Sequence, residues 1–555
     1  MKQTILLSAL ISLSLALFCQ NQICVDGSAS GEENGTPSNP YHTIQEAVNN
    51  ASNGDTIKVA KGTYIEAVQI SQKKMQLLGG FSGNGDFNNA NPQANPTIIN
   101  GTTAAPCIWV NIDAQVISGS LTISGFTIAN GKRGIELTGG WSEKLDNITI
   151  ENNIIENNGL EGDGQRGGGI GLEGNNVTIK NNIIRSNQSW RGAAIGTTGN
   201  APRNFLIANN IIENNTGHSD HAGGVYICGS GSITHNLFDG NVAAASESYG
   251  WGGGIVIFNY DTTKLITLSY NVWRNNYAPL RGGAVFVDEA AKVSMEHELL
   301  YNNKSKESGS AIYVDADWEK NSSVLYMDNC TVSENASDTP DGAALFVQES
   351  ITHIQNCIFW NNVKDFEFYA GGASNAKLTA NYTLSEQGFT GTGNLSVDPL
   401  FADAPNGDFH LKSTKGRYDP ATGLFVNDNV SSPAIDAGNP ASDFSQEPLP
   451  NGERVNLGCY GNTPEASKTP NSGVDDNKNA TWTLFPNPAV KTVTISSLPV
   501  GSRVIISDIT GRIIYTSESD NKSLTICTEN LYTGIYLVQV SNKGCVTHRK
   551  LVVSK

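Results

Sequence analysis

Arginine, histidine and tryptophan recur in this sequence immediately before short runs of small residues. The residues at these positions are Arg166, Arg191, His221, Trp251, Arg281, Ser308 and Asp341. An arginine can form paired hydrogen bonds to a carboxylate, and a tryptophan presents a flat apolar face to a sugar ring. A base next to such an arginine can remove the proton from the carbon beside the carboxylate. The set therefore suits β-elimination on a uronate polymer, provided that the fold brings its members together.

For such a reaction the candidate catalytic residues are His221, Arg191 and Arg281. The candidate binding residues are Arg166, Trp190, Trp251 and Tyr277. The loops around them, which also contain Asp163, His218 and Asp220, vary in length, and variable loops on a rigid scaffold are where binding sites are usually built. An arginine beside a glycine bend also commonly covers the turn, so a purely structural role stays open for each residue.

The sequence also contains candidate residues for two other kinds of chemistry. A glycoside hydrolase needs carboxylates at close range, and Asp315 and Asp317, with Asp288 one repeat earlier, are the candidates. The NTD and GHG triplets typical of pectin hydrolases are absent, which favours a polysaccharide lyase over a hydrolase. The segment GHSDH at 217–221 has the donors of a weak metal site but no helical framing, so no metal site is predicted there.

A repeat positions these residues. The segment Asn152–Asn158 reads NNIIENN, and seven related segments follow, starting at residues 181, 209, 235, 270, 297, 329 and 356. Their fourth position is always large and apolar, and their seventh is always asparagine. Asparagine tolerates left-handed backbone geometry, and stacked asparagine amides can hydrogen-bond along a column. Both columns predict coils stacked on one another.

Each coil contains further strand signals. A small-residue bend leads into alternating apolar residues, as in GGGIGL at 167–172, and a third short strand precedes each asparagine segment, as in NNVTIK at 175–180. Three short strands in coils of this length predict a parallel β-helix. A helix at 42–51 would cap the first coil. Residues 22–465 resemble a widespread family of right-handed parallel β-helix proteins of bacterial surfaces, a resemblance that implies the fold and no particular activity.

The repeat fades after residue 362. We assign 20–411 to the β-helix with its N-terminal cap and 412–465 to a closing segment. Three aspartates of this region, Asp398, Asp436 and Asp443, are candidate Ca²⁺ ligands, although turn and cap carboxylates are the commoner case.

The C-terminal part has a different composition. Residues 466–480 are polar and read as a linker, and 481–555 form a compact β unit. Its PNP turn at 486–488, its DITGR turn at 508–512 and its TGIY element closely resemble the type IX secretion system sorting domain. This resemblance implies passage through the outer membrane by the type IX machinery, removal of the tail and often attachment to lipopolysaccharide. A generic carbohydrate-binding β-sandwich is the alternative.

The N-terminus and the charge also bear on location. Residues 1–19 read as a signal peptide, with Lys2 followed by an apolar run too short to span a membrane, and a lipoprotein signal at Cys19 is the alternative. The net charge of −17 argues against nucleic acid and anionic membranes as partners. No transmembrane segment is predicted. Cys527 and Cys545 could pair, and Cys330 and Cys357 occupy one column as a buried stack or a disulfide.

Two function classes remain open. The first is a secreted or outer-membrane surface-attached, monomeric protein of a Gram-negative bacterium that engages an extended polysaccharide along its side wall, as a uronate lyase if it is an enzyme. The second is a non-catalytic adhesin or structural surface protein. The clustering of arginine, tryptophan and histidine favours the first class, and the lack of a recognisable catalytic set favours the second.

Overall fold

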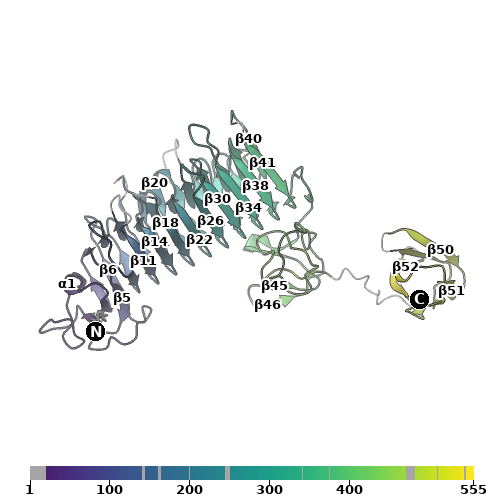
Figure 1. Ribbon diagram of the computed structural model, residues 1–555, viewed down its shortest axis with the longest axis horizontal. Coiled ribbons are helices and arrows are strands. Elements are labelled where there is room, and N and C mark those ends of the chain that lie inside the picture. The colour runs from purple at the N-terminus through teal and green to yellow at the C-terminus, as the bar shows by residue number, and fades with distance from the viewer. Residues whose placement is uncertain are drawn as a thin grey trace, which may run out of the picture. The chain divides into compact units, whose positions relative to one another are not determined.

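Successive coils of the chain add strands to the same parallel sheets, which run side by side along a solenoid (Figure 1). The computed structural model describes residues 21–139, 144–160, 164–198, 201–243, 250–340, 342–373, 375–470, 482–508, 511–542 and 545–555. The signal-peptide prediction, Asp163, Asp341 and most of the predicted linker lie outside these residues. Within them, no helix is long and apolar enough to cross a membrane.

We number the solenoid sheets in the order in which a coil visits them. Sheet 1 is formed by β1 (Gln22–Val25), β2 (Thr56–Ala60), β5 (Gln76–Phe81), β8 (Leu121–Ser124), β11 (Asp146–Glu151), β14 (Asn175–Lys180), β18 (Arg203–Ala208), β22 (Ser230–Thr234), β26 (Leu265–Ser269), β30 (Lys292–Glu296), β34 (Val324–Asp328), β38 (Ile351–Gln355) and β41 (Lys377–Asn381). Sheet 2 is formed by β3 (Gly62–Tyr64), β6 (Thr97–Asn100), β9 (Thr127–Ala129), β12 (Ile154–Glu156), β15 (Ile183–Arg185), β19 (Ile211–Glu213), β23 (Leu237–Asp239), β27 (Val272–Arg274), β31 (Leu299–Tyr301), β35 (Thr331–Ser333), β39 (Ile358–Trp360) and β42 (Leu384–Ser385).

The middle coils add a short strand that the sequence reading of three strands per coil did not include. Sheet 3 is formed by β16 (Gln188–Arg191), β20 (Thr216–His221), β24 (Val242–Ala243), β28 (Tyr277–Ala278), β32 (Lys304–Ser305) and β36 (Ala336–Ser337). Sheet 4 is formed by β4 (Val68–Ser71), β7 (Ile108–Asn111), β10 (Ile135–Thr138), β13 (Ile170–Leu172), β17 (Ile195–Thr197), β21 (Val225–Ile227), β25 (Ile255–Phe258), β29 (Val285–Asp288), β33 (Ile312–Val314), β37 (Leu345–Gln348) and β40 (Phe366–Tyr369).

Both predicted columns are present in the interior. The fourth-position residues of the repeat are fully buried, and the Trp273 ring stacks on Phe238 with a centroid distance of 3.8 Å. The seventh-position asparagines form a continuous hydrogen-bonded ladder, in which, for example, Asn215 Nδ2 donates to Asn241 Oδ1 at 3.0 Å. The left-handed backbone lies one residue earlier, as at Asn214 with a φ of 54°. The asparagine at the seventh position of the repeat is therefore a buried ladder residue and not the turn residue itself.

A second ladder follows the second position of the repeat. It begins at Asn153, whose Nδ2 donates to Asn182 Oδ1 at 3.1 Å, and continues to Asn271. There Asn271 Nδ2 donates to Glu298 Oε1 at 2.9 Å. Beyond Glu298 the column contains Cys330 and Cys357, which are buried and unbridged, with the Cys330 N–H donating to Cys357 Sγ at 3.3 Å. Burial raises the pKa of the Cys330 thiol, which removes it as a nucleophile.

The first coil is capped as the sequence indicates. Helix α1 (Ile44–Asn50) begins at Thr43, whose side chain accepts a hydrogen bond from the Glu46 N–H at 3.2 Å. Its buried face, Ile44, Ala47 and Val48, belongs to the same core as the coils. The helix is shorter than the predicted 42–51 and covers the open apolar end of the solenoid.

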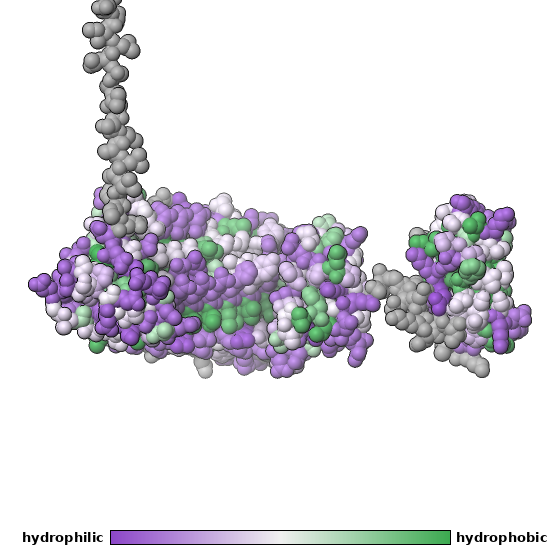
Figure 2. All heavy atoms as spheres, turned by 90° about the horizontal axis from the view of Figure 1, so that it is seen from below, coloured by the Kyte–Doolittle hydropathy of each residue, from purple (hydrophilic) through white to green (hydrophobic). Residues whose placement is uncertain are grey.

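An apolar row runs along the outside of sheet 2 and forms the hydrophobic stripe on the face seen in Figure 2. In register, its members are Ile154, Ile183, Ile211, Leu237 and Val272. Further along the row, Leu299 and Ile358, with Thr331 between them, are buried by the closing region, through Phe409 and Leu457 among others. The strands β43 (Phe401–Asp403) and β44 (Asp408–Leu411), with the 3₁₀ turn Ala404–Asn406, belong to this region.

The chain divides into two compact units. The first runs to Leu411 and includes Ser432–Gln446 and Arg454–Ala466, and the second comprises Lys412–Ser431, Glu447–Glu453 and Ser467–Lys555. In the second unit β45 (Arg417–Asp419) pairs with β46 (Leu424–Val426), and β47 (Thr483–Phe485), β48 (Thr492–Ser496) and β51 (Ser523–Cys527) form one sheet. The other sheet consists of β50 (Ile513–Ser519), β49 (Ser502–Asp508), β52 (Gly534–Asn542) and β53 (Cys545–Val553). Cys527 is exposed and unbridged, and the side chain of Cys545, its candidate partner, lies outside the described residues.

Candidate functional site

The residues that precede the small-residue bends stack in register along the solenoid. Arg166 pairs with Arg191, Arg191 with His221, His221 with Trp251, and Trp251 with Arg281. Neighbouring parallel strands are about 4.8 Å apart, so the five positions span roughly 20 Å of one surface. The structure thus assembles these residues into one row, which we call the bend row.

A glycine bend fixes where each of these side chains points. Gly192, which follows Arg191, has a φ of +59°, and a Cβ at this position would lie 2.4 Å from the Ile195 carbonyl oxygen. No larger residue fits there without a backbone shift. Ala222 takes the same conformation after His221, with a φ of +56°. The bend turns the chain from sheet 3 into sheet 4 and leaves the preceding side chain on the outer surface.

Beneath the bend row lies an aromatic layer on the outer face of sheet 4. In register, it consists of Tyr226, Val256, Phe286, Tyr313 and Phe346. The rings of Phe286 and Tyr313 stack at 5.2 Å, and those of Tyr313 and Phe346 at 4.9 Å. Although Tyr226, Phe286 and Tyr313 point outward from the sheet, they are buried. We call the bend row and this layer together the aromatic wall.

The two arginines at the N-terminal end of the bend row converge on one ring. The guanidinium carbons of Arg166 and Arg191 lie 5.1 and 5.4 Å from the centre of the Tyr226 ring. Arg191 Nη1 also donates to the Tyr226 hydroxyl at 3.2 Å, and its guanidinium lies 4.2 Å from the Trp190 ring. Burial raises the pKa of Tyr226 to about 12, so the phenol stays neutral. Two guanidinium groups therefore meet at one ring at this end of the bend row.

The other candidates are placed less closely together. His221 lies 4.7 Å from the Trp251 ring, next to Arg191 in the row. Arg281 is two strand spacings beyond His221, about 10 Å away, and forms an ion pair with Glu307 at 2.9 Å. Tyr277 lies on sheet 3, in register with Val242 and so outside the bend row. The predicted base and one arginine are therefore neighbours, whereas Arg281 and Tyr277 are not part of the same cluster.

A carboxylate pair lies on the far side of the aromatic layer. Asp288 and Asp315 follow the paired residues Val287 and Val314 in adjacent coils. Burial, together with the negative charge of the neighbouring Asp315, raises the pKa of Asp288 to about 8. Burial raises the pKa of Asp315 to about 6, against the attraction of Arg281. One carboxyl is thus protonated at neutral pH beside one that is largely ionised, a combination used in acid–base catalysis.

Asp317 is not part of this pair. Its carboxylate oxygens accept hydrogen bonds from the Asn321 backbone and side chain at 2.7 and 2.8 Å. The sequence singled out these aspartates only as carboxylates close in number. In the structure Asp288 and Asp315 follow paired strand residues, whereas Asp317 lies in the loop beyond β33, from which its charge still raises the pKa of Asp288.

The candidate calcium ligands mostly bond within their own turns. Asp398 Oδ1 accepts from the Leu400 N–H at 2.8 Å, and Asp443 accepts from the Ser445 N–H and hydroxyl at 3.0 Å each. Within the described ranges, no group of three or more His, Cys, Asp or Glu side chains is arranged to hold a metal ion.

Comparison with known families agrees with this architecture. Residues 91–267 match the family described as right handed beta helix region, and residues 483–554 match the secretion system C-terminal sorting domain. The chain is a right-handed parallel β-helix protein with a type IX sorting domain. A further family, described as disaggregatase related, matches residues 373–438. The sorting domain marks this β-helix protein for secretion or display on the cell surface. No curated protein matches the chain.

Similar solved structures share little sequence with this β-helix protein. PorZ, a surface component of the type IX secretion system of Porphyromonas gingivalis, is 24% identical over 17% of this chain and 15% of its own, with a TM-score of 0.14. The pectate lyase Pel9A is 14% identical over 80% of this chain and 97% of its own, with a TM-score of 0.40. XylC, solved with xylose, is 12% identical over 91% and 95%, with a TM-score of 0.35.

Proposed function

We propose that this exported solenoid binds an extended anionic polysaccharide along the aromatic wall. The observation that carries the proposal is the register of the bend row, which lines up Arg166, Arg191, His221, Trp251 and Arg281 on consecutive coils. A row of this length matches several sugar units of a polymer better than a small metabolite. Arginines at one end supply the contact to a carboxylate or sulfate, and the partly exposed Trp251 supplies an apolar face.

Replacing Arg191 by alanine is expected to weaken binding of an anionic polysaccharide by about tenfold or more, since a charge-assisted contact is lost. Affinity gel electrophoresis of the folded protein with a panel of uronate and sulfated polymers measures the effect. The matched control is Arg185→Ala. Arg185 lies on sheet 2 in the same coil, where it pairs with Glu156 at 2.7 Å. Equal losses in both variants, or no retardation by any polymer, would contradict the proposal.

Whether the bound chain is cut is a separate question with two candidate chemistries. The neighbouring Arg191 and His221 supply the charge neutraliser and base of a uronate lyase. The Asp288 and Asp315 pair favours hydrolysis of a glycosidic bond, with Asp288 as the acid and Asp315 as the base or nucleophile. A protein that binds a polymer and releases no product would instead be an adhesin or a structural surface protein.

If Asp288 is the acid, Asp288→Asn is expected to lower the release of reducing ends roughly hundredfold. Activity should rise as Asp315 ionises above about pH 6 and fall as Asp288 loses its proton above about pH 8. Reducing-end assays from pH 4 to 10, run beside ultraviolet detection of unsaturated products, separate the two chemistries. Unsaturated products that disappear in His221→Ala and persist in Asp288→Asn would establish the lyase and exclude the hydrolase.

A further inference from the structure

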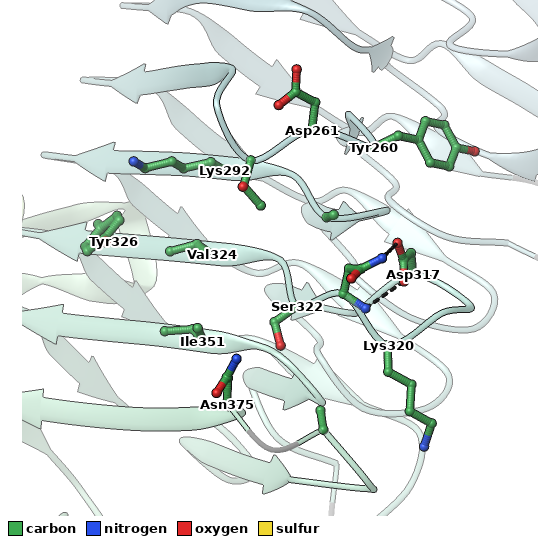
Figure 3. Close-up of a pocket in the computed structure, with 14 residues that line it drawn as sticks. Tyr260, Asp261, Lys292, Asp317, Lys320, Ser322, Val324, Tyr326, Ile351 and Asn375 are labelled. Carbon is green, nitrogen blue, oxygen red and sulfur yellow. Dashed lines mark hydrogen bonds between the residues drawn. The ribbon is translucent and has the colours of Figure 1, made fainter.

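A cavity of about 640 Å³ opens on sheet 1, at the start of β30, β34 and β38 (Figure 3). Its floor is formed by Lys292, Val324 and Ile351, which are paired in register on these strands. Its rims come from the loops that lead into sheet 1, including Tyr260 on one side and Asn375 on the other. The volume lies within the range of small-molecule sites, and the loops, which differ in length between coils, create the hollow.

The lining combines apolar and hydrogen-bonding surface. Val324 and Ile351 give an apolar floor, and two tyrosine rings stand beside it, Tyr326 with 42% and Tyr260 with 66% of its surface exposed. Asn375 adds an amide at the opposite rim (Figure 3). A pyranose ring has apolar C–H faces and a polar rim, so exposed tyrosines over an aliphatic floor suit a sugar unit.

Two carboxylates, Asp261 and Asp317, and two lysines, Lys292 and Lys320, line the cavity, and Asp261 is paired with Lys264 at 3.9 Å. Asp317 is held by Asn321 through the two hydrogen bonds drawn in Figure 3, so both of its oxygens have partners within its own loop. Lys320 is paired with Glu349 at 3.0 Å. Lys292 forms no ion pair with any residue that the structure describes. A ligand with a negative group can therefore place it at Lys292 without displacing an existing ion pair.

The cavity adjoins the aromatic wall around the corner between sheet 4 and sheet 1. The Tyr226 ring stacks on Phe258 at 4.3 Å, and Phe258 meets Tyr260 edge to face at 6.2 Å. Tyr260 is also a rim residue of the cavity. A continuous line of rings thus joins the end of the wall that carries Arg166 and Arg191 to the cavity.

We propose that this cavity is a second carbohydrate site, which binds a single acidic sugar unit with its carboxylate at Lys292 and its ring against Tyr326. Binding of the isolated sugar does not depend on the wall. A branch or a chain end of a polymer could also occupy the cavity while the polymer lies on the aromatic wall, and this part of the proposal rests on the proposed function.

The test measures binding of methyl glucuronide to the folded full chain by saturation-transfer NMR, with methyl glucoside as the neutral match. Lys292→Ala is expected to weaken glucuronide binding at least tenfold and to leave glucoside binding unchanged. Tyr326→Ala should weaken both. The matched control is Lys304→Ala, since Lys304 lies in the same coil on sheet 3, is already paired with Asp338 at 2.7 Å and does not line the cavity.

Arg191→Ala separates the cavity from the wall. Glucuronide binding that survives Arg191→Ala and is lost in Lys292→Ala supports the cavity site. Binding that is lost in Arg191→Ala and survives in Lys292→Ala overturns it, as does the absence of saturable binding. Circular dichroism confirms that each surface variant is folded. If the polymer fails to bind the wall while the monosaccharide still binds at Lys292, the proposed function fails and the cavity site stands.

Discussion

Asn241→Ala is expected to lower the free energy of unfolding by roughly 3–6 kcal/mol, because several buried hydrogen-bond partners lose their counterpart at once. Asn241 Nδ2 donates to Asn276 Oδ1 at 3.0 Å and to the Ile212 carbonyl at 2.8 Å. Its Oδ1 accepts from Asn215 Nδ2 at 3.0 Å and from the Asn215 N–H at 3.2 Å. The residue is fully buried, so water cannot replace the amide in the native state.

Urea denaturation followed by circular dichroism gives the change in stability, and hydrogen exchange shows where it arises. Because each coil contacts only its neighbours, faster exchange should be confined to the coils of Asn215, Asn241 and Asn276. The control is Asn275→Gly, at a left-handed position with a φ of 57° that glycine adopts readily, and it should cost less than about 1 kcal/mol. A uniform loss across the solenoid, or a cost equal to that of the control, would refute the ladder's role.

The repeat was readable from the sequence because its two periodic properties are local. A large apolar residue three positions before an asparagine identifies each coil without knowledge of its partners. The second ladder was missed because the residue type changes along its column. The second position of the repeat is asparagine up to Asn271 and then becomes Glu298, Cys330 and Cys357, so it shows no constant residue, although the repeat does place the two cysteines in one column.

In the candidate site, too, the features marked by a local sequence pattern could be predicted, and those that depend on contacts between coils could not. The bend row could be predicted because a glycine or alanine bend follows each residue directly in the chain. The carboxylate pair of Asp288 and Asp315 could not be separated from Asp317, since their relation depends on the register between coils of different length. The cavity at Lys292 is formed by loops whose lengths follow no repeat, and no sequence pattern marks it.

The resemblance to a sorting domain was the most specific signal in the chain, since its motifs occur in a fixed order over a short segment. The sorting domain indicates export and says nothing of the ligand. The solenoid, in contrast, bears on the ligand and says nothing of export. The proposed ligand, an extended anionic polysaccharide, rests on the solenoid alone, where Arg166 and Arg191 lie over one ring.

Glu298 is expected to make the solenoid less stable as the pH rises from about 4.5 to about 8. Burial raises the pKa of its carboxyl to about 8, although hydrogen bonds from Trp273 Nε1 and Asn271 favour the ionised form. Below about pH 4.5 the carboxyl is protonated whether the chain is folded or unfolded, so its titration does not change the free energy of unfolding there. Between the two values the folded state holds one proton more, so stability falls as pH rises, by about 4–5 kcal/mol in total.

Glu298→Gln removes this titration while it keeps the size of the side chain. The variant presents an amide to Trp273 Nε1, so its stability at pH 5 should be equal to or below that of the natural protein. By pH 9 the difference between the two should have moved in favour of the variant by about 4–5 kcal/mol, since only the carboxyl must lose a buried proton. Urea midpoints of both proteins at each pH measure this difference, and other titrating groups such as Asp288 cancel from it. A difference that stays constant from pH 5 to pH 9 would show that Glu298 is already ionised within the ladder.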